Sequence, residues 1–113
     1  MIDRNKPFLS PESVAASFGV ATDMAYGSVA PPLYLTSTYE FAGYDQPRLY
    51  DYGRAGNPTR DLLGDALAAL EGGAGCVITS SGMAALDLLI GRLGPDDLVL
   101  APHDCYGGTM RLL

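Results

Sequence analysis

The sequence predicts an α/β fold in which short parallel strands alternate with helices. Two mostly apolar runs, residues 76–79 and 98–101, lack the polar alternation of half-exposed strands and are typical of buried ones. Helical patterns cover residues 58–71 and 82–93, before and between these runs. Strands separated by helices usually form a parallel sheet covered on both faces, so we expect the start of such a sheet here.

Local signals define the helix ends. Ser10 and Pro11 predict a short helix that runs through Phe18 and ends at Gly19. Asn57 is a good N-cap, Pro58 suits a first helical turn, and Gly72-Gly73 is a typical end. The second helix should present one apolar face, made of Leu62, Leu63, Ala66, Leu67 and Leu70. The fourth helical pattern begins after Gly108.

The first half of the chain, residues 1–57, has no clear periodicity and contains several prolines. Residues 33–41 are rich in β-branched and aromatic side chains, which favours an extended segment or a short edge strand. Two interpretations remain open on composition: a loosely packed tail, or an arm that packs on a partner subunit. The aromatic content is high for a solvated tail, with Tyr26, Tyr34, Tyr39, Phe41, Tyr44, Tyr50 and Tyr52.

Composition narrows the function classes. The 113 residues carry a formal net charge of −6, which argues against nucleic acid or anionic membranes as partners. Two cysteines do not make a disulfide framework, and residues 1–10 lack the apolar run of a signal peptide. No apolar stretch is long enough to span a membrane, and we expect a cytoplasmic protein.

The segment from Thr79 to Met83 lies where a strand should end and a helix begin. The first N–H groups of that helix have no internal acceptors and favour a phosphate, which small residues such as Ser81 and Gly82 would let approach. The alternative is an ordinary capped helix start, which many α/β domains contain. The spaced glycines of dinucleotide-binding and Walker motifs are absent.

Tyr106 follows the second strand and should lie on the same rim of the sheet, where its ring could stack on an aromatic cofactor. The alternative is a core tyrosine. The adjacent His103-Asp104-Cys105 run does not predict a metal site, because three consecutive side chains diverge and no further ligand cluster completes them. We therefore predict no metal.

Two arginines are candidate anion ligands. Arg54, with the hydroxyl of Tyr52 nearby, offers a planar guanidinium suited to phosphate, and Arg111 could reach a substrate carboxylate. Each has an alternative as a solvated surface residue.

Taken together, Tyr52-x-Arg54, Gly56-Asn57-Pro58-Thr59-Arg60, the Ser81-Gly82-Met83 turn and Tyr106-Gly107-Gly108 resemble the Cys/Met-metabolism enzymes that use pyridoxal phosphate (PLP). This family includes cystathionine γ-synthases, cystathionine γ-lyases and methionine γ-lyases. The resemblance runs from about residue 26 to residue 113. It implies the aspartate-aminotransferase fold (PLP fold type I): residues 1–57 as an arm that reaches a neighbouring subunit, and 58–113 as the beginning of the large three-layer domain.

The resemblance also implies roles for individual residues. Ser81, Gly82 and Met83 would bind the cofactor phosphate, and Tyr106 would stack on the pyridine ring as the catalytic residue present. Tyr52 and Arg54 would reach the phosphate of the neighbouring subunit's cofactor. The enzyme would be a homotetramer built from two dimers. Asp51, Arg54 and Arg111 would contact an amino-acid substrate.

Asp51, the run 103–108 and Arg111 look most like the bacterial synthase branch of the family. That branch implies a γ-replacement in which cysteine sulfur displaces the acyloxy group of O-succinylhomoserine, a step of methionine biosynthesis. The lysine that holds PLP is expected beyond residue 113, so we expect these residues alone to be inactive. Two alternatives remain: a cystathionine γ- or β-lyase, and a non-catalytic PLP- or phosphate-binding assembly fragment.

Overall fold

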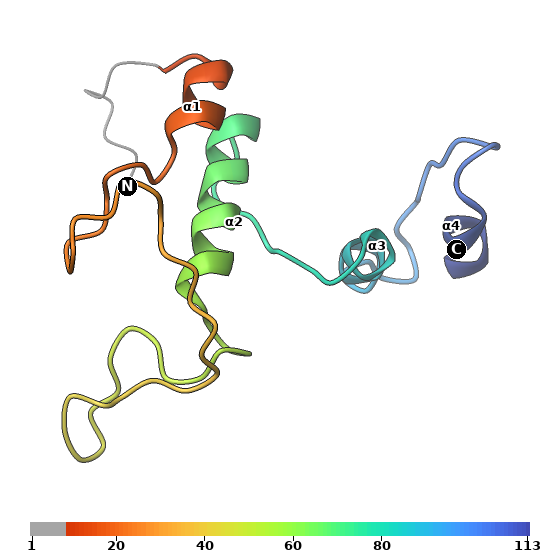
Figure 1. Ribbon diagram of the computed structural model, residues 1–113. Helices are drawn as coiled ribbons and strands as arrows, with labels where there is room; N and C mark the ends of the chain where they lie inside the picture. The colour runs from red at the N-terminus through yellow and green to blue at the C-terminus, as the bar shows by residue number, and fades with distance from the viewer. Residues whose placement is uncertain (1–8) are drawn as a thin grey trace. The chain divides into compact units, whose positions relative to one another are not determined.

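The computed structural model describes residues 9–113 (Figure 1). Most of the segment 1–10, for which a signal peptide was not expected, lies outside these residues. The described chain contains α1 (Pro11–Ser17), α2 (Pro58–Glu71), α3 (Gly82–Ile90) and α4 (Gly107–Leu112). It divides into two compact units, one ending at Val77 and the other spanning Ile78–Leu113.

The helix α1 begins and ends close to the predicted residues. The Ser10 hydroxyl accepts a hydrogen bond from the Ser13 N–H at 3.3 Å and caps the first turn. The last helical residue is Ser17, one before the predicted end, and Phe18 is the C-cap. Gly19 has φ +76°, and an added Cβ would lie 3.0 Å from Leu62, so glycine is required there for both conformation and space.

The helix α2 confirms the expected caps. Asn57 accepts from the N–H groups of Thr59 and Arg60, and Pro58 opens the helix. Gly72 ends it in the left-handed conformation, φ 65° and ψ 23°.

One face of α2 packs against α1 (Figure 1). The expected apolar stripe lines a hollow of about 360 Å³ together with α1, whose contributions are Val14, Ala15 and Phe18. Gly64 and Ala68 of α2 are buried. Small residues at these two positions let neighbouring segments approach the helix closely.

The segment before α2 is attached to the start of that helix. The Thr59 hydroxyl accepts from the Tyr34 N–H at 2.9 Å, and the Asn57 side-chain amide donates to the Tyr34 carbonyl at 3.1 Å. For residues 33–41, an extended segment or a short edge strand was expected, and the edge strand is not formed. Only isolated bridges occur in this region, between Thr38 and Tyr52 and between Gly43 and Gln46.

The two buried strands predicted at 76–79 and 98–101 are also not formed within residues 9–113. Val77 is 72% exposed, Leu98 82% and Leu100 87%. A strand needs a neighbour to accept its hydrogen bonds and to cover its side chains, and the described residues supply neither. The apolar composition of these segments was identified correctly, but their burial was not.

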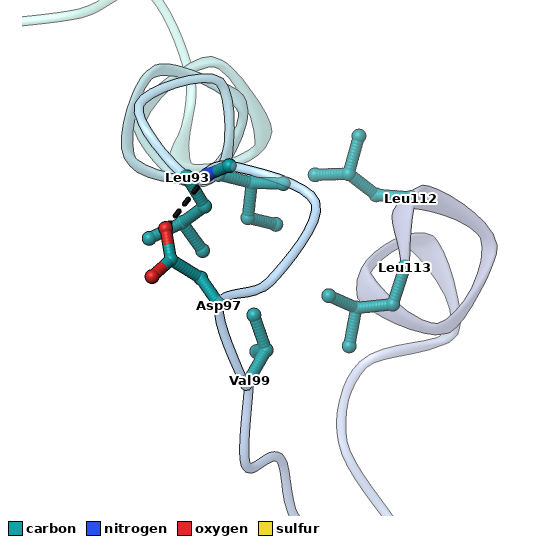
Figure 2. A pocket seen from close by; sticks show the side chains of 7 residues that line it. Leu93, Asp97, Val99, Leu112 and Leu113 are labelled. Atoms are coloured by element: carbon teal, nitrogen blue, oxygen red, sulfur yellow. Dashed lines mark hydrogen bonds between the residues drawn. The ribbon is translucent and has the colours of Figure 1, made fainter.

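The unit Ile78–Leu113 is built on α3 and α4, which contact each other. α3 ends at Ile90 rather than at the predicted Leu93, and a turn follows in which the Gly94 N–H donates to the Asp97 carboxylate at 2.6 Å. Figure 2 shows Leu93 and Val99 with Leu112 and Leu113 around a pocket in this unit.

No helix of residues 9–113 is both long and apolar enough to cross a membrane.

Candidate functional site

The turn before α3 presents a capped helix start. Ser81 is extended (φ −161°, ψ 160°), and its hydroxyl accepts from the Ala84 N–H at 3.1 Å. Its carbonyl accepts from the Ala85 N–H and from the Thr79 hydroxyl. Ser81 thereby fixes the direction in which the first N–H groups of the helix point.

Two of those N–H groups are available for a ligand. In the part of the chain that the structure describes, neither the Gly82 nor the Met83 N–H has a hydrogen-bond acceptor. A Cβ added at Gly82 would meet no heavy atom within 4 Å, so the approach to this end of the helix is open. Free donors at the positive end of a helix dipole suit an anionic group such as a phosphate.

A cavity of about 560 Å³ joins this turn to Tyr106 within the unit Ile78–Leu113. Its other side chains come from one face of α3 and from α4. The lining residues are Ser81, Gly82, Met83, Ala85, Leu86, Leu89, Tyr106 and Thr109. The structure therefore gathers four predicted site residues, Ser81, Gly82, Met83 and Tyr106, around one space.

The Tyr106 ring is 72% exposed, so the alternative of a core tyrosine does not apply to the described chain. Tyr106 is the N-cap of α4 and makes no side-chain capping bond. A Cβ added at Gly108 would lie 2.6 Å from Tyr106 Cε1 and 2.9 Å from Met83 Sδ. The ring and the thioether thus both pack over Gly108, and the absence of a side chain there permits this arrangement.

Arg111, in the last turn of α4, is exposed and does not line this cavity. Its Nη1 atom lies 3.8 Å from the position that a Cβ on Gly107 would take, so the guanidinium folds back along its own helix. The substrate-contact role assigned to it above stays a prediction.

Tyr52 and Arg54 belong to the other unit and lie together there. The Arg54 guanidinium carbon is 5.3 Å from the centre of the Tyr52 ring, within cation–π range. The Asp51 carboxylate accepts from the Tyr52 N–H at 2.6 Å and is thus engaged by its own loop.

Sequence reasoning missed one residue beside these sites and the contact of another. Thr109 lines the cavity three residues after Tyr106, and the i, i+3 spacing on a helix was the available signal. Arg60 belongs to the family motif, but no sequence pattern predicts that it donates to the Gly53 carbonyl, seven residues earlier, at 3.2 Å.

Among residues 9–113, no three His, Cys, Asp or Glu side chains gather in a way that could hold a metal ion. Cys76 and Cys105 are both free thiols.

Comparison with known proteins identifies close relatives. The family model described as Cys/Met metabolism PLP-dependent enzyme matches residues 12–113. Cystathionine gamma-synthase of Escherichia coli K12 is 54% identical over 101 residues, which are 88% of this chain and 26% of that protein. A cystathionine beta-lyase of Lactococcus lactis is 42% identical over 95 residues, 84% of this chain and 25% of that protein.

Solved structures that resemble this chain include cystathionine gamma synthases. A cystathionine gamma synthase from Xanthomonas oryzae pv. oryzae, in complex with cystathionine, matches with a TM-score of 0.86 and 52% identity, over 95% of this chain and 28% of that one. The chain therefore has the backbone course of the corresponding part of a cystathionine synthase, and this agrees with the expected fold type. It spans about a quarter of the length of the curated relatives that it matches.

Proposed function

The chain belongs to the Cys/Met metabolism PLP-dependent enzymes, and from this premise we propose that it is the N-terminal part of a cytoplasmic cystathionine γ-synthase. The complete enzyme joins cysteine to O-succinylhomoserine, with loss of succinate, and serves methionine biosynthesis. The observation that carries the proposal is the cavity in which the free Gly82 and Met83 N–H groups and the Tyr106 ring meet. The 54% identity to a cystathionine gamma-synthase favours this member of the family.

The family's cofactor is pyridoxal phosphate, and the residues around the cavity fit it. When bound, PLP supplies an electron sink for carbanions next to its imine carbon. Gly82 and Met83 would donate their N–H groups to the phosphate, with Ser81 beside them. The exposed Tyr106 side chain would stack on the pyridine ring, and its hydroxyl would then be available to move a proton at the reacting amino group.

The loop with Tyr52 and Arg54 would serve the neighbouring subunit. Arg54 would form a bidentate pair with that subunit's cofactor phosphate, and the Tyr52 hydroxyl would add a hydrogen bond. Asp51, Arg54 and Arg111 would position the amino-acid substrate. Such an arm makes the site incomplete without a second copy, which supports a dimer. Membership of the family extends this to the homotetramer, a dimer of dimers, that we propose.

The proposed domain boundary lies at residues 57 and 58, between an arm and the first part of the large domain. The compact units of the structure divide later, after Val77. Because α1 packs on α2, the later division reflects contacts of the arm with that helix. The proposed boundary refers to the role of each part in the assembled enzyme.

A lyase is the second candidate, favoured by the 42% identity to the Lactococcus lactis cystathionine beta-lyase. It would use the same cofactor contacts to cleave cystathionine. A non-catalytic PLP- or phosphate-binding fragment is the candidate of another class, and it needs only the cavity.

The test is product analysis with the full-length enzyme. We expect cystathionine from O-succinylhomoserine and cysteine, and little 2-oxobutyrate or pyruvate when cystathionine is the substrate. The reverse pattern would establish a lyase. The 113-residue chain, assayed alone as a control, should bind PLP reversibly at most and form no product.

A further inference from the structure

The loop of residues 51–56 is held to the preceding segment by backbone hydrogen bonds. The Tyr39 N–H donates to the Asp51 carbonyl at 3.0 Å, and the Gly53 N–H donates to the Ser37 carbonyl at 2.8 Å. Within the loop, the Tyr52 carbonyl accepts from two N–H groups farther along. These bonds fix the backbone on one side of the loop only.

Arg60 holds the other side. It lies in the first turn of α2 and donates from Nη1 to the Gly53 carbonyl at 3.2 Å. Its Nε is 3.9 Å from the Asp61 carboxylate, which helps orient the guanidinium. Among residues 9–113, this is the one side-chain hydrogen bond that reaches the backbone of the loop from outside it.

The position of this contact matters for the two residues on either side of it. Gly53 lies between Tyr52 and Arg54, and its carbonyl belongs to the peptide group that leads into Arg54. Holding that carbonyl restricts the orientation of the peptide group, and with it the position of the Arg54 Cα from which the side chain leaves the backbone. A Cβ on Gly53 would lie 3.3 Å from the Thr36 carbonyl, so the backbone of the preceding segment also approaches Gly53 closely.

We propose that Arg60 is a positioning residue for PLP binding: it orders the Tyr52–Arg54 loop through the Gly53 carbonyl and does not itself touch the cofactor. This inference rests on the proposed function, in which Tyr52 and Arg54 bind the phosphate of a neighbouring subunit's PLP. Its chemical content is specific. A donor as long as the arginine side chain is required at residue 60 to reach the Gly53 carbonyl, and the shorter amide of glutamine does not replace it.

The expected effect follows from loop populations. The apparent dissociation constant of a ligand rises in proportion as the binding-competent fraction of its site falls. Loss of one hydrogen bond from a charged donor is enough to lower the fraction of molecules with an ordered loop to about one tenth. We therefore expect about tenfold weaker PLP binding without Arg60.

The experiment compares Arg60→Gln, Arg60→Lys and the matched control Arg92→Gln in the full-length enzyme. Arg92 is exposed, and its side chain makes no hydrogen bond or ion pair with residues 9–113, so its replacement removes the same charge without the contact. The measurements are the PLP dissociation constant of the apoenzyme, the apoenzyme's thermal midpoint, and kcat at saturating PLP. We expect about tenfold weaker binding in R60Q, an intermediate value in R60K, no change in R92Q, and recovery of kcat in excess PLP.

An unchanged dissociation constant in R60Q overturns the proposal. So does a purely structural effect, seen as a lowered apoenzyme thermal midpoint with kcat that excess PLP does not restore. If R60Q does not fold, R60K carries the same comparison. Should the wild-type enzyme bind PLP but form no cystathionine, the proposed function fails, while the PLP constants of R60Q and R92Q still decide the role of Arg60.

Discussion

The side chain of Asn57 makes two separable kinds of contact, and replacing it in steps should reveal both. Its carbonyl oxygen caps α2 by accepting from the Thr59 N–H at 2.9 Å and, more weakly, from the Arg60 N–H at 3.4 Å. Its amide nitrogen donates to the Tyr34 carbonyl at 3.1 Å and to the Tyr39 hydroxyl at 3.2 Å. Serine at residue 57 keeps the cap and loses the amide; alanine loses both.

The magnitudes follow from the exposure of each contact. Loss of the cap costs about 1 kcal/mol. The bond to Tyr34 is exposed and should contribute about 0.5 kcal/mol, since water replaces the donor, whereas the half-buried bond to Tyr39 should contribute about 1 kcal/mol. We therefore expect Asn57→Ser to cost about 1.5 kcal/mol and Asn57→Ala about 2.5 kcal/mol.

Amide hydrogen exchange resolves the two effects by position. In N57S, the Thr59 amide should keep its protection while the Tyr34 amide, whose residue loses a hydrogen bond to its carbonyl, exchanges faster. In N57A, the Thr59 amide should also exchange faster, by about fivefold for 1 kcal/mol. Equal acceleration of the Thr59 amide in both variants would refute the assignment of the cap, and an unchanged Tyr34 amide in N57S would refute the assignment of the amide contacts.

Two further predictions concern the packing over Gly108 and the hydrogen bonds of Asp23. Gly108→Ala should lower the thermal midpoint relative to Gly107→Ala, because of these two positions only residue 108 would bring the new Cβ into collision with the Tyr106 ring. The steric cost is about 1–3 kcal/mol. Equal midpoints of the two variants would contradict this packing. Hydrogen bonds from backbone N–H groups, chiefly that of Ser28, lower the pKa of Asp23 below its ordinary value. The contribution of this carboxylate to the free energy of unfolding should thus be present at pH values above the ordinary pKa and be lost as the pH falls through the lowered pKa. An NMR titration of the carboxyl group with its midpoint at or above the ordinary Asp pKa would contradict the contact.

Much of the local structure could be predicted because its causes lie within a few residues. A cap such as Asn57 bonds to N–H groups two and three residues later, and a left-handed glycine such as Gly72 depends only on its own backbone. The same holds for the free N–H groups of Gly82 and Met83, on which the phosphate-binding prediction rests. Unpaired N–H groups are a property of any helix start, so they are present here although the adjoining strand is not formed.

The predictions that failed depend on distant partners. Residues 76–79 and 98–101 have the composition of buried strands, but burial is a property of the neighbours that cover a segment and not of the segment itself. In the described chain these neighbours are absent, and Val77 and Leu98 are exposed. The edge-strand alternative for residues 33–41 is absent for a related reason: the Thr59 hydroxyl of α2 and the amide of its N-cap Asn57 pair with the backbone at Tyr34 in place of a strand.

The same distinction separates the two halves of the proposed cofactor site. The donors of Gly82 and Met83 and the ring of Tyr106 surround one cavity within a single unit, so their geometry depends on contacts such as those over Gly108. Arg54, by contrast, lies on a loop whose backbone is fixed by residues of another segment and by Arg60. A pattern of residue types predicted both halves and included Arg60, but it could not predict the contact that Arg60 makes, because a guanidinium that binds a carbonyl seven residues earlier leaves no periodic trace in the sequence. Residues that position a functional loop are therefore found from the hydrogen bonds of its backbone, and those that contact the ligand are found from residue type.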